Sequence, residues 1–471
     1  CDWSSDVCSS DLADENGRLV RVEAKILIDG GAYASTTAAV LANACYFAVG
    51  PYRCDSVAVD GIGTRTNNPP CGAMRGFGAV QVCFGYESQM DRLAAELDMD
   101  PLEVRRRNAL ATGDQLATTG QVIETPLPVV EVIDSLAAMP LLLDEPGADG
   151  ELPGGSGLTT EPGHVRRGIG YALSIKNLGF SEGFDDYAQA RVRLTEDGAI
   201  VETAAIEVGQ GLVNVLAQIA RTALGVSRAE VRHVDTSRID SAGSTSASRQ
   251  TQLSGGAAHE ASRRLREKIL ARYEGDDLDD EGVWRGDTLM VSWDDLVRES
   301  WEETVTFRHP PTEPPDENGQ GKMHADFAVA GHRAVVDVDA ELGMVRVQRV
   351  DTAQDVGRAL NPESIRGQIE GGILQGVGLA VMEELVLDGG RIRNATFTDY
   401  LLPTILDAPD VEAILIEQDG SWGPFGAKGV GEPPTISSTP AVVAAIRDAT
   451  GKDLDRVPVR PQDIALEETA R

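Results

Sequence analysis

The chain has 471 residues, enough to bury a large core in two or three subdomains. It carries 42 Lys and Arg residues against 75 Asp and Glu residues, a formal net charge of −33, which disfavours binding to nucleic acid or to an anionic membrane surface. No apolar run approaches the roughly 20 residues of a membrane span, and no signal-peptide pattern is present. We therefore expect a protein of the reducing cytoplasm.

The cysteines and histidines do not form a metal-binding pattern. The six cysteines include no CxxC pair, and the six histidines include no HExxH pair. Zinc ribbons and cysteine-held iron–sulfur clusters need such spacings. If the chain uses a metal, we expect that its own side chains are not the main ligands.

Residues 1–12 share no pattern with the rest of the chain. They look like the translation of a sequencing adapter, so we expect the native sequence to begin near Ala13, within a domain of a longer protein. Residues 13–139 are then expected to form a first subdomain that is incomplete at its N-terminus. Residues 140–166 are rich in Gly, Pro and acidic residues and predict a linker to a second subdomain over 167–471.

Periodicity of apolar residues predicts strands and helices that alternate without a strict βαβ repeat. The strand at 19–28 places Val20, Val22, Ala24, Ile26 and Ile28 on one face. In chain order the predicted elements are this strand, helices at 80–97 and 104–110, a hairpin of 187–194 with 199–206, helices at 212–224 and 257–273, a hairpin of 335–338 with 344–350, and helices at 364–385 and 441–449. The fold class predicted is α+β.

Glu432 lies on a glycine turn, Lys428-Gly429-Val430-Gly431-Glu432, with two prolines directly after it. Glycines let the backbone approach other groups closely, and prolines stiffen the segment in which they occur. A single acid held in this way is suited to act as a general base. A surface turn that happens to contain a glutamate is the alternative.

Four further stretches combine small residues with amide or hydroxyl donors, three of them at the start of a predicted helix. Such stretches can bind a phosphate-bearing cofactor through N–H groups and the helix dipole. Taken singly, each is more often a helix cap. They are Arg75-Gly76-Phe77-Gly78, Glu207-Val208-Gly209-Gln210-Gly211, Ser244 to Arg249, and Gly367 to Gly372 with Gln375-Gly376.

In the order and spacing of these stretches the chain resembles the molybdenum-binding subunit of the xanthine dehydrogenase and aldehyde oxidase family. The resemblance runs from about Asp29 to about Asp463, and Asn67 to Gly78 and Asp355 to Pro362 carry much of it. It implies a two-part domain that binds a molybdenum–molybdopterin cofactor, in its cytosine dinucleotide form. It also implies electron transfer to iron–sulfur and FAD partner subunits in a hetero-oligomer.

The resemblance gives each site residue a role. Glu432 would be the general base that activates the water-derived oxygen on molybdenum for attack on xanthine or hypoxanthine. Phe77 would stack on the substrate, Tyr171 would be a second aromatic on it, and Arg75 and Ala247 would lie nearest the metal. The cofactor-binding positions would be Arg75, Gly76, Gly78, Gln210, Gly211, Ser246, Ala247, Ser248, Gln368, Gln375 and Gly431.

Two departures from the family pattern concern the substrate. Asn43 stands at the spacing where many xanthine-oxidising relatives carry a purine-binding arginine, and the family's upstream cofactor and substrate segment would precede Ala13. Oxidation of aldehydes or of other N-heterocycles is therefore an alternative to purine oxidation. A non-catalytic paralogue, or a fragment that is inactive alone, is a further one.

Overall fold

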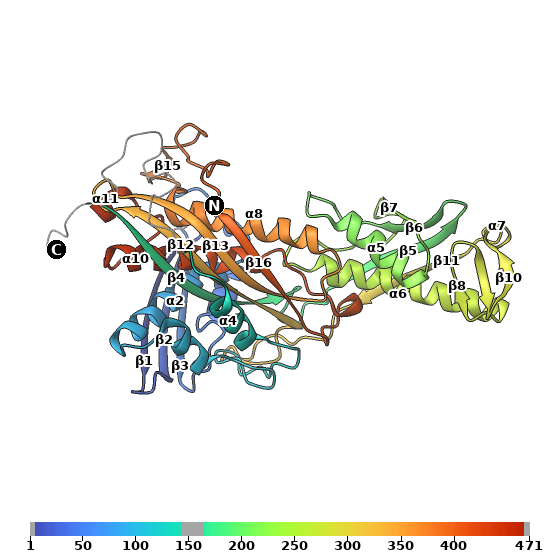
Figure 1. Ribbon diagram of the computed structural model, residues 1–471, viewed down its shortest axis with the longest axis horizontal. Coiled ribbons are helices and arrows are strands. Elements are labelled where there is room, and N and C mark those ends of the chain that lie inside the picture. Colours follow the sequence, from blue (N-terminus) through green and yellow to red (C-terminus); the bar gives the residue numbers. More distant parts are fainter. Residues whose placement is uncertain (1–4, 143–163, 466–471) are drawn as a thin grey trace.

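The computed structural model describes residues 5–142 and 164–465, and it consists of two connected lobes (Figure 1). Most of the expected linker, 140–166, lies outside the described residues. The larger lobe holds the N-terminal sheet and a sheet of long strands, and the narrower lobe holds the middle of the chain. The predicted mixture of helices and strands is confirmed.

The N-terminal sheet has the order β1 (Ser5–Ala13), β2 (Leu19–Asp29), β3 (Val57–Thr64), with β1–β2 antiparallel and β2–β3 parallel. Helices α1 (Thr37–Tyr46) and α2 (Ala79–Glu96) pack against it. Leu12 pairs with Arg21 and Ala13 with Leu19, so Val20 bulges out of register. It is 51% exposed and does not share the buried face of Val22, contrary to the prediction. Residues 5–12 form most of β1, but a regular strand does not show whether this segment is native. The adapter origin of residues 1–12 therefore stays a prediction.

Helix α3 (Pro101–Asn108) begins three residues before the predicted start at 104. The Asp100 side chain accepts hydrogen bonds from the N–H groups of Leu102 and Glu103, and Pro101 occupies the first turn, where it needs no donor. The Met99-Asp100-Pro101 segment is therefore a helix start. Helix α4 (Val129–Ala138) follows.

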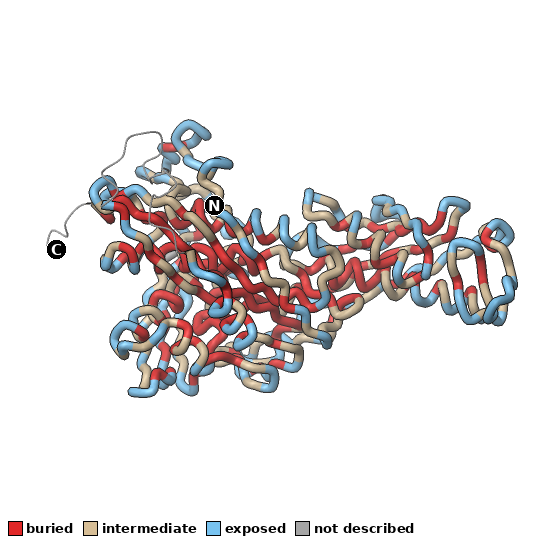
Figure 2. The backbone as a smooth tube through the Cα atoms, viewed as in Figure 1, coloured by how far each residue is buried: buried red, intermediate tan, exposed pale blue. Residues whose placement is uncertain are grey.

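The central sheet has the order β16 (Asp410–Glu417), β13 (Met344–Gly357), β12 (Asp326–Asp339), β4 (Val165–Leu178). Strand β16 runs parallel to β13 and the other pairs are antiparallel. Every residue of β12 is buried, and the central strands form much of the buried interior in Figure 2. The predicted hairpin at 335–350 is thus part of two 14-residue strands.

Helices cover both faces of this sheet. A Cβ at Gly331 of β12 would touch Val132 of α4, while the next residue, His332, bonds Ser437 at the start of α10 (Ser438–Thr450). Successive strand residues point to opposite faces, so α4 and α10 lie on opposite sides. Gly168 and Gly170 of β4 let α10 approach closely, because a Cβ there would collide with its backbone.

The narrower lobe contains the sheet β11 (Glu302–Arg308), β5 (Tyr187–Thr195), β6 (Gly198–Thr203), β7 (Ala229–His233). Helices α5 (Leu212–Leu224) and α6 (Gln250–Tyr273) pack on it, and α6 begins seven residues before the predicted start. The predicted hairpin and the bounds of α5 are confirmed. A small sheet of β8 (Asp277–Leu278), β9 (Gly282–Arg285) and β10 (Thr288–Ser292), with α7 (Trp293–Leu296), closes its far end.

The remaining elements surround the candidate site. Helix α8 (Pro362–Val381) ends four residues before the predicted end, and the pair β14 (Leu387–Asp388) and β15 (Arg391–Ile392) follows. The turn η2 (Pro424–Gly426) and helix α9 (Pro433–Ile436) flank the Glu432 loop, and α11 (Pro461–Ala465) is the last described helix. Within the described part of the chain, no helix has the length and apolar character that crossing a bilayer requires.

Candidate active site

Glu432 is the N-cap residue of α9 and is only 7% exposed. The N–H of Gly76 lies 3.3 Å from Oε1, and the Ser248 hydroxyl donates to Oε2 at 2.9 Å. The N–H of Glu432 in turn reaches the Ser248 oxygen at 3.0 Å. The carboxylate is therefore held from both sides, one donor coming from before α2 and the other from before α6.

The Ser248 loop fits against the Glu432 turn because both backbones are unusual. Ala247 and Ser248 have φ values of +52° and +50°, in the left-handed region that non-glycine residues rarely adopt. Opposite them, a Cβ at Gly429 would come within 1.7 Å of the Ser248 carbonyl oxygen. Glycine is thus required at 429 for the two loops to meet.

Arg75 connects three segments that the sequence analysis singled out separately. Its Nε donates to the carbonyl of Gly431, and its Nη2 donates to the carbonyl of Gln368 in α8 at 2.9 Å. Burial lowers the pKa of Arg75, and the Glu432 carboxylate opposes that shift. The Arg75, Gly367–Gly372 and Glu432 stretches are therefore one site.

Phe77 lies between Gly76 and Gly78 in a run of three positive φ values, +100°, +47° and +92°. It is half-buried and packs against the core of the N-terminal sheet. Asn43 is 4% exposed, and its Nδ2 donates to the Phe77 carbonyl at 2.6 Å. This geometry argues against the predicted substrate contact for Asn43, whose amide instead fixes the backbone that presents Phe77.

Tyr171 does not join the residues around Glu432. It lies in β4, its carbonyl accepts a hydrogen bond from Arg105 at 3.1 Å, and it pairs with Arg333. Burial raises the pKa of Tyr171. Sequence reasoning missed Phe180, which follows Gly179, a residue whose N–H donates to the Ala247 carbonyl at 2.9 Å. Phe180 therefore lies next to the loop that positions Glu432.

The remaining predicted cofactor contacts are spread over neighbouring loops. The Gln210 side chain closes its own turn: its Nε2 donates to the Ile206 carbonyl and its Oε1 accepts the N–H of Val208. Gly211 faces Ser364 near the start of α8. Ser246 is exposed and bonds Ser244, and Gln375 is half-buried on α8. No described contact joins Gln210, Ser246 or Gln375 directly to Glu432.

The Gln210 turn is closed further by Glu207. Its carboxylate accepts the N–H groups of Gly209, Gly211 and Val213 at 2.8 to 3.0 Å. Burial alone would raise the pKa of Glu207, but these backbone hydrogen bonds hold it below its ordinary value. The N-terminus of α5 therefore already has an anionic partner from the chain itself.

Lys176 is a second charged group at Glu432 that sequence reasoning missed. It lies in β4 with 2% of its side chain exposed, and its Nζ is 3.9 Å from Oε2 of Glu432. Burial lowers the pKa of Lys176, and Glu432 opposes that shift. The available signal was a lone lysine in the largely apolar run 172–178.

Comparison with known proteins shows the family to which the chain belongs. Residues 157–409 match a family model described as a molybdopterin cofactor-binding domain, and residues 12–109 match a second model with the same description. The first match alone covers more than half of the chain. The chain belongs to the molybdopterin-binding subunits of the xanthine dehydrogenase and aldehyde oxidoreductase family.

Similar proteins include a probable xanthine dehydrogenase subunit of Bacillus subtilis, 30% identical over 96% of this chain and 60% of its own. The "Xanthine dehydrogenase molybdenum-binding subunit" of Escherichia coli O157:H7 is 32% identical over 84% of this chain and 53% of its own. The structure of quinoline 2-oxidoreductase from Pseudomonas putida, 25% identical, superposes with a TM-score of 0.80 over 98% of this chain and 61% of that one. The chain thus spans between half and two thirds of the length of these relatives.

The residues of this molybdopterin-binding subunit fit the cofactor. A Cβ at Gly209, Gly367 or Gly371 would meet nothing within 4 Å, so two of the predicted cofactor stretches, 207–211 and 367–372, border open space. Thr435 Oγ1, beside Arg75 and Gly372, is buried and has no hydrogen-bond partner among the described residues. In residues 5–142 and 164–465, no group of three His, Cys, Asp or Glu side chains is placed to hold a metal.

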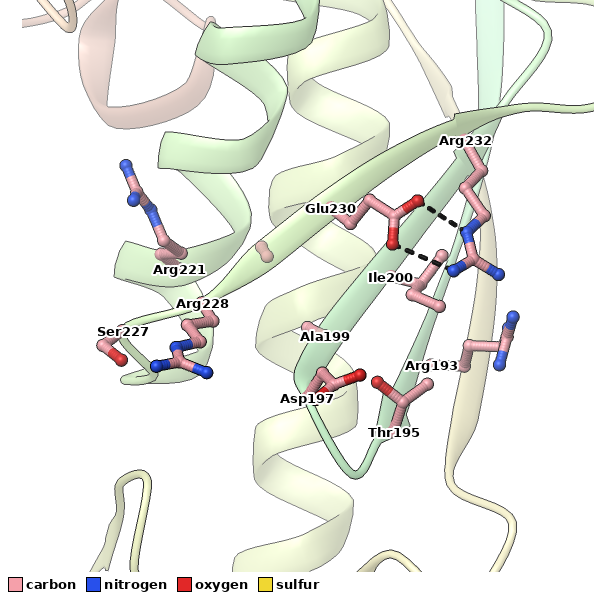
Figure 3. Close-up of a pocket in the computed structure, with 11 residues that line it drawn as sticks. Arg193, Thr195, Asp197, Ala199, Ile200, Arg221, Ser227, Arg228, Glu230 and Arg232 are labelled. Carbon is pink, nitrogen blue, oxygen red and sulfur yellow. Dashed lines mark hydrogen bonds and ion pairs between the residues drawn. The ribbon is translucent and has the colours of Figure 1, made fainter.

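A separate hollow of about 390 Å³ lies in the narrower lobe between β5, β6, β7 and the end of α5 (Figure 3). Four arginines line it, but Glu230 and Asp197 lie among them, and Glu230 bonds Arg232. The positive charge is therefore partly neutralised within the hollow. None of the residues predicted for the cofactor or the substrate lines it.

Proposed function

We propose that this subunit is the catalytic part of a molybdenum hydroxylase that oxidises xanthine- or hypoxanthine-type purines with oxygen from water. The observation that carries the proposal is the buried Glu432 carboxylate, held by Gly76 and Ser248 where the 75–78, 244–249 and 367–372 stretches meet. A rigid, buried acid in this setting is suited to general base catalysis.

Bound molybdopterin would supply the metal that activates the oxygen and accepts the two electrons of the oxidation. Glu432 would act as the general base, its carboxylate oxygens taking up the proton that oxidation of an electron-poor carbon next to nitrogen releases. Gly76 and Ser248 aim the carboxylate, and Phe77 offers a ring face for a flat heterocycle. The stretches 75–78, 209–211, 246–248 and 367–375 hold the cofactor, for which we propose the cytosine dinucleotide form.

Electrons leave the site through other proteins. The described residues offer no cluster of side chains for an iron centre, so we propose that iron–sulfur and FAD subunits accept the electrons in a hetero-oligomer. Similar proteins are named as subunits, among them the "6-hydroxypseudooxynicotine dehydrogenase complex subunit gamma" of Paenarthrobacter nicotinovorans. The chain expressed alone would then show no turnover with a soluble dye.

Oxidation of an aldehyde or of another N-heterocycle is the second candidate. Its support is that Asn43 is uncharged and that its amide is engaged with the Phe77 carbonyl, so this position offers no cation to a purine. The "Aldehyde oxidoreductase" of Megalodesulfovibrio gigas is 29% identical over 96% of this chain, so similarity alone does not favour one substrate class.

The test uses the full-length protein assembled with its partner subunits, as wild type, Glu432→Gln and Glu230→Gln. We expect Glu432→Gln to keep its molybdenum and pterin but to lose turnover by about 10²- to 10⁴-fold. Glu230 is exposed in the narrower lobe, so Glu230→Gln should match the wild type. A fully active Glu432→Gln enzyme would refute the role of Glu432, and a panel of xanthine, hypoxanthine, an aromatic aldehyde and quinoline separates the substrate classes.

A further inference from the structure

Lys176 is a buried cation that the base mechanism has not yet used. Strand β4 holds it between Ile175 and Asn177, and its backbone pairs with Ala328 of the fully buried strand β12. The backbone of Lys176 is therefore fixed, and its ammonium group can move only by rotation about the side-chain bonds. That side chain ends 3.9 Å from Oε2 of Glu432.

The hydrogen bonds of Lys176 leave one direction of its ammonium group for Glu432. Nζ donates to the carbonyl of Asn177 at 3.0 Å and to the Oδ1 of the same residue. An ammonium group carries three N–H donors, so one remains. Among the described residues, Glu432 is the carboxylate within 4 Å of Nζ.

The other titratable group near Lys176 cannot balance its charge. Burial lowers the pKa of His324 to about 3, with a further contribution from the charge of Lys176, so His324 is neutral. Its two ring nitrogens have no hydrogen-bond partner among the described residues. The positive charge of Lys176 is therefore balanced by Glu432.

The distance of 3.9 Å between Nζ of Lys176 and Oε2 of Glu432 determines how the two charges interact. It exceeds hydrogen-bond length, so Lys176 attracts the charge of the carboxylate without occupying one of its lone pairs. Gly76 and Ser248 each take one acceptor position, which leaves lone pairs free for a proton. Arg75, the other cation facing Glu432, is bonded to the carbonyls of Gly431 and Gln368.

We propose that Lys176 is a positioning residue for Glu432: its ammonium group attracts the carboxylate and keeps it aimed between Gly76 and Ser248. The inference rests on the proposed function, because Glu432 needs an ionised carboxylate only if it acts as a base. An apolar residue in place of Lys176 would fill the same space and remove this charge.

The first test compares pH profiles of kcat/KM in the full-length, assembled, cofactor-loaded enzyme. The variants are Lys176→Met, Lys176→Arg and, as a matched control, Lys322→Met, which removes a lysine from a surface pair with Glu124. In Lys176→Met we expect the acidic limb to move to higher pH by about one to three pH units, with an unchanged molybdenum content. Lys176→Arg keeps the charge, so it and Lys322→Met should follow the wild type.

The second test does not need turnover. An infrared titration follows the carboxyl band that disappears in Glu432→Gln, and in Lys176→Met this band should appear at higher pH than in the wild type. An unmoved band and an unmoved acidic limb in Lys176→Met would overturn the inference, as would an equal shift in Lys176→Arg. If Lys176→Met does not accumulate, Lys176→Gln provides the neutral side chain.

The two proposals fail separately. Full activity of Glu432→Gln would remove the base from the proposed function, whereas the infrared titration would still decide whether Lys176 controls the ionisation of Glu432.

Discussion

Lys428 and Asp355 form an ion pair with Nζ and Oδ2 2.7 Å apart and with both side chains fully buried. Lys428 opens the Glu432 turn and Asp355 lies near the end of β13, so the pair fastens this turn to the central sheet. Lys428 Nζ also donates to the carbonyl of Pro126 at 2.8 Å. Burial raises the pKa of Asp355 to about 6, although Lys428 opposes the shift.

Removing one member of this pair should destabilise the protein strongly. Asp355→Asn leaves the Lys428 charge buried and unbalanced, so we expect a loss of about 3–5 kcal/mol in the free energy of unfolding. The double variant Asp355→Asn/Lys428→Met should recover much of it. Urea unfolding measures both, and Lys322→Met, at an exposed pair, should cost less than about 1 kcal/mol. A loss of the same small size in Asp355→Asn would contradict the assignment.

Gly429 and Gly371 provide a matched pair of glycine substitutions. Gly429→Ala would place a Cβ 1.7 Å from the Ser248 carbonyl, so it must displace the hydroxyl that orients Glu432. We expect a destabilisation of about 1–3 kcal/mol or more and a loss of turnover on the order of 100-fold.

Gly371→Ala lies inside α8 with open space around the new methyl group, so it should raise stability by about 0.5–1 kcal/mol. Thermal melting of both variants checks the predicted stabilities, and the turnover of Gly429→Ala is compared with that of the wild type, because Gly371 lies in a predicted cofactor stretch. Equal behaviour of the two variants would show that the contact between Gly429 and Ser248 does not constrain the site.

His324 should make the protein sensitive to acid. Its pKa is about 3 in the folded state and about 6.5 when unfolded, so the unfolded chain takes up the proton first and stability falls between pH 6.5 and 3. At pH 5 this amounts to about 2 kcal/mol. His324→Phe keeps the stacking on Phe47 and removes the titration, so it should unfold less readily than the wild type at pH 5.

The measurement is the urea midpoint at pH 7.5 and pH 5 for His324→Phe, with His233→Gln as an exposed control. The fall in midpoint on acidification should be smaller in His324→Phe alone. A fall equal to that of the wild type would mean that His324 is not the group that titrates.

The sequence predicted the elements whose signals are local. Helix α5 has the predicted bounds because Gly211 and Gly225 enclose an amphipathic stretch, and the hairpin of β5 and β6 follows from alternation and its glycine. Strand β4 was missed and β12 was predicted too short, because buried polar residues interrupt their apolar patterns. Lys176, His332 and Arg333 are acceptable there only through partners from distant segments, which periodicity does not record.

In the candidate site too, local sequence signals could be recognised and contacts between distant segments could not. The glycine-rich stretches and Glu432 could be recognised because their residue types are unusual in themselves. The hydrogen bond of Asn43 to Phe77 and the approach of Lys176 to Glu432 depend on how α1 and β4 pack, so the residues alone suggested a substrate contact for the first and gave no role to the second.

The hydrogen bonds that assemble the site join residues far apart along the chain: Arg75 and Gly76 lie 356 positions from their partners at Gly431 and Glu432, and Ser248 lies 184 positions from Glu432. Contacts between residues so far apart form late in folding, because the chain must lose the entropy of closing a long loop before such a contact stabilises it. During synthesis, the strands of the N-terminal sheet and of the central sheet leave the ribosome before residue 432 does. On this reasoning the Glu432 contacts form after the elements on either side of them, and a chain that stalls before residue 432 would carry every predicted cofactor stretch except the one that contains Glu432.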